Sequence, residues 1–345
     1  MRKFLFPFSL IYAGITASRN FLFDRRIFKP FQFDVLTVGI GNLSVGGTGK
    51  SPHVEYLISL LQSEFHIATL SRGYGRKTKG FLISTSETSA REIGDEPAAF
   101  KLKYPSMPVA VCENRVLGVV ELLSSEPDVD LILLDDVFQH RAILPHIQIL
   151  LTAFDSPFYD DFVLPAGNLR ELRKGANRAD LIVVTKCPEN VTLETQQNMV
   201  SAIKAYNDKA IVCFSKIIYG ELINPFSQEV FCVESNMSVF AFAGIANPSD
   251  FFNELRKRCS VKHIALSDHY NYQKEDLNSF KNMTDATIWI CTEKDAVKLF
   301  PFKDWFIEAG ISLYYLPIKV QFISSDFDHH FFNLIRLSQQ TISES

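Results

Sequence analysis

Short apolar runs of strand length alternate with amphipathic segments from Asp34 onward. The runs are nearly continuous in Val, Ile and Leu, which is typical of strands buried on both faces of a mostly parallel sheet. The first group comprises DVLTVGI, HIATLS, PVAVC, DLILLDD, IQILLT, DLIVVTK and AIVCFS. A second group comprises VFAFAGI, VKHIAL, TIWICT and ISLYYLP, with helical patterns around 249–258 and 273–283. We therefore expect an α/β protein whose active-site loops lie at the carboxyl ends of the strands.

A polar interval, YGELINPFSQEV (219–230), separates the two groups of runs. We place a domain boundary there, because domains meet in polar linkers. The expected domains are an N-terminal helix over 1–28, a first α/β domain over 29–220, and a second, smaller α/β domain over 221–345.

The N-terminal segment has an apolar stripe between two groups of cations. The stripe recurs at helical spacing and comprises Phe4, Phe8, Ile11, Ile15 and Leu22. The apolar run from Phe4 to Ala17 is shorter than the ~20 residues that a membrane-spanning helix needs. The pattern favours an amphipathic anchor lying in the plane of a membrane. A helix packed against the protein's own core is the alternative.

Composition and charge exclude several classes of protein. The 345 residues are 47% hydrophobic and 21% charged, which excludes a disordered chain. The only apolar run near spanning length is the N-terminal one, so a polytopic membrane protein is excluded as well. With 35 basic and 39 acidic residues, the net charge of −4 gives no case for nucleic-acid binding. Any anionic substrate must therefore be bound by a local site.

The clearest motif is VGIGNLSVGGTGKSPHVEYLISLL (38–61), in which a strand, a glycine-rich loop and a helix follow one another. In such a loop backbone N–H groups bind phosphate oxygens, the lysine reaches the β and γ phosphates, and the hydroxyl binds Mg²⁺. The usual pattern has glycine where this chain has Ser44, so a plain glycine turn is the alternative. The predicted nucleotide-binding residues are Gly46, Gly47, Thr48, Gly49, Lys50 and Ser51.

Further candidate residues follow other predicted strands. Asp135 and Asp136 end the run DLILLDD, where carboxylates can hold Mg²⁺, although two aspartates there could also cap a helix or turn. Weaker signals are IGDEP (93–97), PAGNLRE (165–171) and SDHYNY (267–272), since single charged residues in loops are usually solvated.

Taken together, the motifs resemble a known family. GNLSVGGTGKSP, SRGYG, GDEP, DDVFQH, PAGNLRE, GIANP, SDHY and TEKDAVKL occur in the order and spacing of the tetraacyldisaccharide 4′-kinases, the lipid A 4′-kinases of Gram-negative bacteria. The resemblance extends from residue 1 to about residue 300 and includes the N-terminal segment. It implies a P-loop kinase that uses ATP and Mg²⁺ to phosphorylate the 4′-hydroxyl of a tetraacyl glucosamine disaccharide 1-phosphate. It also implies peripheral or monotopic attachment to the cytoplasmic face of the inner membrane, without an obligate protein partner.

The resemblance also assigns roles to residues. Asp95 would be the base that accepts the hydroxyl proton, His269 would assist it, and Lys50 would act on the transferred phosphoryl group. This pairing requires the second domain to close over the first. Arg170 would bind the nucleotide phosphates. The implied metal site comprises Ser51, Asp135, Asp136 and Glu171.

Two positions depart from the family pattern. The family commonly has glycine where this chain has Val137, and proline where it has Leu172. The alternative function is a P-loop GTPase or ATPase that acts as a switch or motor, because TEKD (292–295) and VVTK (183–186) partly match the guanine-reading element N-K-x-D. Both lack its leading asparagine. A soluble small-molecule kinase is a third interpretation, which leaves the N-terminal stripe unexplained.

Overall fold

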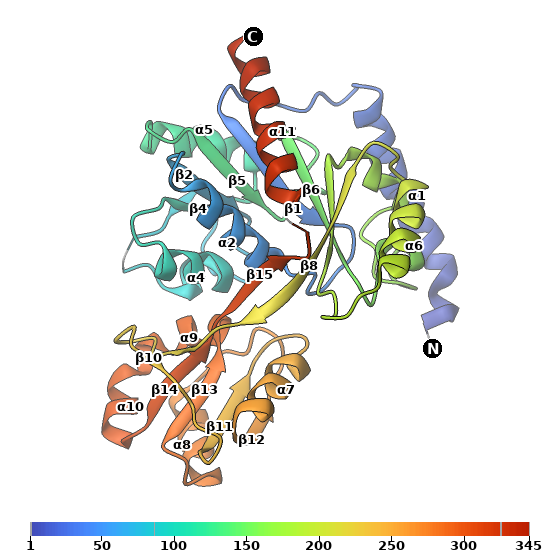
Figure 1. Ribbon diagram of the computed structural model, residues 1–345. Coiled ribbons are helices and arrows are strands. Elements are labelled where there is room, and N and C mark those ends of the chain that lie inside the picture. Colours follow the sequence, from blue (N-terminus) through green and yellow to red (C-terminus); the bar gives the residue numbers. More distant parts are fainter. Residues whose placement is uncertain (1, 86, 325, 345) are drawn as a thin grey trace.

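Figure 1 shows the computed structural model, which describes residues 2–85, 87–324 and 326–344. The larger of its two sheets forms the centre of the upper lobe. Its strand order is β15-β8-β7-β6-β1-β5-β2-β4-β3. Only the outermost pairs, β15 with β8 and β3 with β4, are antiparallel within this described sheet. The strands are β1 (Leu36–Asn42), β2 (Ile67–Ser71), β3 (Leu82–Ile83), β4 (Val109–Val111), β5 (Leu131–Asp135), β6 (Ile147–Ala153), β7 (Leu181–Thr185), β8 (Ile211–Tyr219) and β15 (Ile318–Phe322).

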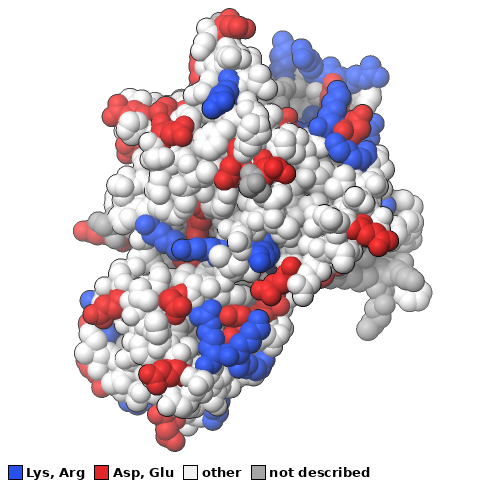
Figure 2. Space-filling model, in the orientation of Figure 1, with Lys and Arg blue, Asp and Glu red and all other residues white. Residues whose placement is uncertain are grey.

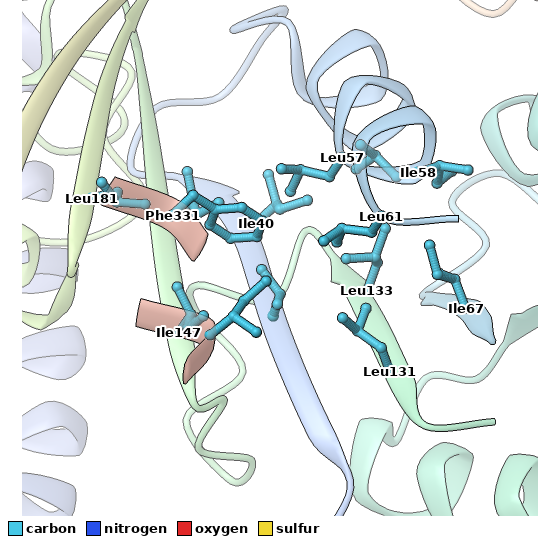
Figure 3. Packing of buried hydrophobic residues seen from close by; sticks show 14 of the residues in the cluster. Ile40, Leu57, Ile58, Leu61, Ile67, Leu131, Leu133, Ile147, Leu181 and Phe331 are labelled. Atoms are coloured by element: carbon cyan, nitrogen blue, oxygen red, sulfur yellow. The ribbon is translucent and has the colours of Figure 1, made fainter. Parts of the chain in front are cut away.

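Both faces of this sheet are covered by helices, which explains the continuous apolar runs. On one face Ile40 and Leu133 pack against Leu57 and Leu61 of α2 and against Phe331 of α11 (Figure 3). The opposite face packs against α5 and α6. The helical segments of this lobe are η1 (Arg2–Leu5), α1 (Phe6–Asp24), α2 (Lys50–Leu61), α3 (Ala90–Ile93), α4 (Asp95–Lys103), α5 (Arg115–Ser125), η2 (Phe158–Asp160), η3 (Arg173–Arg178), α6 (Leu193–Lys204) and α11 (Asp326–Ser343).

The second lobe is built on a six-stranded sheet of order β10-β9-β14-β13-β11-β12 among the described residues. Its last four strands are parallel, and its core lies between α7 on one face and α8, α9 and α10 on the other. The strands are β9 (Leu222–Ile223), β10 (Val230–Phe231), β11 (Ser238–Ala243), β12 (Ser260–Ala265), β13 (Ile288–Thr292) and β14 (Ser312–Leu316). The helices are α7 (Ser249–Arg258), α8 (Lys274–Met283), α9 (Glu293–Leu299), η4 (Phe300–Phe302) and α10 (Lys303–Ala309).

The end of the chain departs from the expected domain over 221–345. Strand β15 leaves the second lobe and pairs with β8, from Ile318 opposite Tyr219 to Phe322 opposite Ser215. Helix α11 then buries Phe327, Phe331 and Ile335 in the core of the first lobe. The second lobe is therefore an insertion over about 220–317, and its two connections form an antiparallel ribbon. The expected boundary near 220 coincides with the end of β8.

Helix α1 lies along one side of the first lobe (Figure 1). Phe8, Ile11 and Ile15 of the predicted stripe are exposed, together with Phe4 just before the helix, whereas Leu22 is half-buried. The inward face makes both apolar and polar contacts: Tyr12 and Ala13 pack against a core cluster, and the Ser9 hydroxyl accepts a hydrogen bond from Ala166 N at 2.9 Å. None of the described helices is both long and apolar enough to cross a membrane.

Candidate active site

The glycine-rich loop leaves the carboxyl end of β1 in the middle of the first sheet and leads into α2. Gly46 (φ 109°) and Gly49 (φ 83°) have positive φ values, which residues with a Cβ atom rarely adopt. Helix α2 begins at Lys50 and runs for 12 residues, so its free N–H groups and the positive end of its dipole face the loop. The geometry is that of a phosphate-binding cradle.

Side chains from neighbouring strands hold this loop. The Asn42 amide donates a hydrogen bond to Thr48 Oγ1 at 2.9 Å, and the Thr185 hydroxyl donates to Thr48 O at 2.8 Å. Ser44, where glycine is usual, forms an antiparallel bridge with Leu169. Because a bridging residue has extended backbone, this position needs no glycine, which explains the departure from the usual pattern.

Charged side chains converge beside the loop. Asp136 Oδ1 lies 3.5 Å from Lys50 Nζ and 3.0 Å from Arg170 Nη1. Burial alone would raise the pKa of Asp136, but the charges of Lys50 and Arg170 outweigh it and hold this pKa below its usual range. Asp136 is therefore an ionised carboxylate at the end of β5, next to the loop lysine.

Asp135 is fully buried, and its Oδ1 has no hydrogen-bond partner in the described part of the chain. Burial, together with the nearby charge of Glu96, raises the pKa of Asp135 to about 7. A buried carboxylate oxygen without a hydrogen-bond partner suits a hard cation such as Mg²⁺. Among the described residues, no group of three or more His, Cys, Asp or Glu side chains is arranged to hold a metal ion.

Glu171 has contacts that differ from those expected of a metal ligand. Both of its oxygens accept hydrogen bonds from Arg178, at 2.7 and 3.1 Å, and Glu171 is buried. Gln139 donates to Oε1 at 3.2 Å, and Asn20 of α1 donates to Oε2 at 2.6 Å. A carboxylate that accepts from four N–H groups is already neutralised and satisfied, so these contacts favour Glu171 as an anchor for α1 over a role in metal binding.

Asp95 and His269 meet across the two lobes. His269 Nδ1 lies 2.9 Å from Asp95 Oδ2, and Lys298 Nζ lies 3.0 Å from the same oxygen. Burial would raise the pKa of Asp95, but the hydrogen bond from His269 and the charge of Lys298 hold it below its usual range. The same hydrogen bond raises the pKa of His269. The pair that the resemblance implied is thus in contact, with Asp95 ionised.

Glu96, which follows Asp95 at the start of α4, connects this pair to the phosphate loop. Burial would raise the pKa of Glu96, but Lys294, Lys50 and a hydrogen bond from Ser51 lower it to about 2. Lys294 forms an ion pair with Glu96 from the second lobe. No role was predicted from the sequence for Lys294, Lys298, Gln139 or Arg178. The motif TEKDAVKL contains the two lysines and DDVFQH contains Gln139, so these motifs were the signals that could have identified them.

The two departures from the family pattern cause no strain. The left-handed backbone in DDVFQH falls on Asp136 (φ 49°), a residue type that tolerates it, and not on the β-branched Val137. Leu172 has a φ of −61°, the value that a proline ring would impose.

Comparison with known proteins agrees with this geometry. The family model described as tetraacyldisaccharide-1-P 4′-kinase matches residues 1–336. The chain is 44% identical over 325 residues to a tetraacyldisaccharide 4′-kinase of Flavobacterium johnsoniae, covering 94% of each chain. It is 36% identical to one of Bacteroides thetaiotaomicron, covering 100% of this chain and 96% of that one.

Among solved structures, the chain is similar to LpxK from Aquifex aeolicus in complex with ATP. The TM-score is 0.77 and the identity 29%, over 96% of this chain and 99% of that one. The chain therefore belongs to the tetraacyldisaccharide-1-P 4′-kinase family.

Proposed function

We propose that this ATP-dependent kinase phosphorylates the 4′-hydroxyl of a tetraacyl glucosamine disaccharide 1-phosphate, and that Asp95 is the base. The observation that carries the proposal is the position of Asp95. It pairs with His269 of the second lobe and precedes Glu96, which hydrogen-bonds Ser51 of the phosphate loop. A hydroxyl held against Asp95 would face the terminal phosphate of a nucleotide bound to that loop.

The reaction requires one bond to form and one to break. The acceptor oxygen attacks the γ phosphorus, its proton passes to Asp95, and ADP leaves with the electrons of the broken P–O bond. Lys50 and Arg170 stabilise negative charge on the phosphoryl oxygens. Ser51, Asp135 and Asp136 would hold Mg²⁺, which supplies further charge neutralisation when bound. Contact between the lobes would exclude water that could otherwise hydrolyse ATP.

The N-terminal helix supports a membrane site of action. Its outward stripe is apolar, and Arg25, Arg26 and Lys29 beyond its end are exposed. Figure 2 shows basic side chains gathered at this corner of the molecule. Apolar side chains flanked by cations favour binding to an anionic lipid surface. We place the enzyme at the cytoplasmic face of the inner membrane, attached peripherally or monotopically through 1–28.

Transfer of label tests the proposal. Purified protein is incubated with γ-labelled ATP, Mg²⁺ and the tetraacyl disaccharide 1-phosphate in mixed micelles, and the lipid is analysed for label at the 4′ position. We expect transfer by the native protein. In Asp95→Asn, which keeps the shape of the side chain, kcat should fall by about 10²–10⁴-fold while ATP still binds. Brisk hydrolysis of ATP without any transfer would instead favour the switch or motor class.

A further inference from the structure

Helix α9 of the second lobe lies against α4 of the first, and its charges face opposite charges there. Glu293 forms an ion pair with Lys103, Lys294 with Glu96, and Lys298 with Asp95. Val297 of α9 packs into an apolar cluster that contains residues of α4. Basic and acidic side chains also lie together over the junction between the lobes in Figure 2. Helix α9 therefore fixes how the second lobe sits on α4.

Two side chains of the second lobe meet at one oxygen of Asp95. Both His269 Nδ1 and Lys298 Nζ bind its Oδ2, at 2.9 and 3.0 Å. Two cationic or polar donors that meet at one oxygen restrict rotation of the carboxylate about its Cβ–Cγ bond and so fix its direction.

The buried carboxylate of Asp295 connects Lys298 with the loop that carries His269. Asp295 is fully buried, and its Oδ1 lies 3.5 Å from Lys298 Nζ. Its Oδ2 accepts hydrogen bonds from the Thr292 hydroxyl at 2.7 Å and from Gly244 N at 2.9 Å. Gly244 O in turn accepts from His269 N at 3.1 Å. The position of Lys298 and that of the His269 backbone are thus coupled within the second lobe.

We propose that Lys298 is a positioning residue for phosphoryl transfer, which together with His269 holds the Asp95 carboxylate in the orientation that accepts the proton of the acceptor hydroxyl. The inference rests on the proposed function, in which Asp95 is the base. Lys298 transfers no proton in this scheme, because its ammonium group only orients Asp95 and keeps it ionised. If Lys298 had only a structural role, it would help α9 to dock on α4, as Glu293 does through its ion pair with Lys103.

The experiment compares four variants of the full-length chain: Lys298→Met, Lys298→Arg, Glu293→Gln and Asp95→Asn. Steady-state transfer to the disaccharide lipid gives kcat and the KM for ATP. In Lys298→Met we expect kcat to fall by about tenfold to a hundredfold with an unchanged KM for ATP, because misplacing a reacting group by about 1 Å costs about that much. Lys298→Arg, which restores the charge, should recover most of the rate. Glu293→Gln removes a docking charge away from Asp95 while Lys103 keeps its ion pair with Glu55, so this variant should stay within about threefold of the native rate.

The outcomes separate the two proposals. Native activity in Lys298→Met, failure of the arginine variant to recover activity, or an equal loss in Glu293→Gln would each overturn the positioning role. An inactive Asp95→Asn with a fully active Lys298→Met would overturn this inference and leave the proposed base intact. Full activity in Asp95→Asn would overturn the proposed base itself, and with it the role of Lys298.

Discussion

The outward face of α1 offers a sharp test of membrane attachment. Phe8, Ile11 and Ile15 are 60%, 63% and 66% exposed. Full burial of such a side chain stabilises by about 1.5–3 kcal/mol, so the exposed two-thirds corresponds to roughly 1–2 kcal/mol each on insertion into lipid. Replacing all three with serine should therefore remove roughly 3–6 kcal/mol of membrane affinity, a loss of about 10²–10⁴-fold in the partition coefficient.

Co-sedimentation with vesicles that contain anionic lipid measures this coefficient. The same substitutions should leave the melting temperature nearly unchanged, because these side chains contact water and not the core. Leu193 of α6, at 75% exposed, supplies the matched control, since Leu193→Ser removes an exposed apolar side chain from a different helix. An unchanged partition coefficient in the triple variant would refute membrane insertion of the stripe. A large fall in melting temperature would instead show that the stripe is part of the protein's core.

Three other predictions concern the phosphate loop, the residues that meet across the lobes, and the returning helix. Lys50→Ala should lower kcat by orders of magnitude with an unchanged circular dichroism spectrum, because Lys50 lies beside the phosphate cradle, and near-native turnover would exclude that loop as the nucleotide site. The hydrogen bond with Asp95 raises the pKa of His269, so its imidazole should titrate above 6.5 in an NMR experiment, and the charged pair should be lost as pH rises through this raised pKa. Asp95→Asn should return this titration to lower pH, and no change would mean that the contact is not formed in solution. Phe331→Ala should lower the free energy of unfolding of the first lobe by about 3–5 kcal/mol in denaturant titrations, whereas a loss below about 1 kcal/mol would argue against α11 in its core.

The central strands of the first sheet could be predicted because almost every side chain on β1, β2, β5, β6 and β7 is buried. In β5 Leu133 packs on one face and Leu134 on the other, so the run has no polar interruptions to disguise it. The phosphate loop could be predicted because its backbone conformation demands glycine at Gly46 and Gly49. Each of these signals lies within a few residues of sequence.

Signals that depend on distant parts of the chain were weaker. Asp95 and His269 are 174 residues apart, and only the family resemblance linked them. The return of β15 to the first sheet was missed because its sequence, IKVQF, alternates apolar and polar residues and was not among the apolar runs that predicted the sheets. The role of Glu171 as a metal ligand came from the family resemblance alone, and its contacts with Asn20 and Arg178 could not be predicted because these residues come from other elements.

The ribbon of β8 and β15 has a consequence for synthesis of the chain. Because β15 pairs with β8 and α11 completes the core, the first lobe cannot finish folding until the last strand and helix have left the ribosome. Until then the nascent protein exposes the unpaired edge of β8 and the apolar face that later covers Phe327 and Phe331, and both favour aggregation. The second lobe, in contrast, is complete once β14 has emerged. The inserted lobe can therefore fold first, and a premature stop after residue 317 would damage the lobe that binds nucleotide while leaving the inserted one whole.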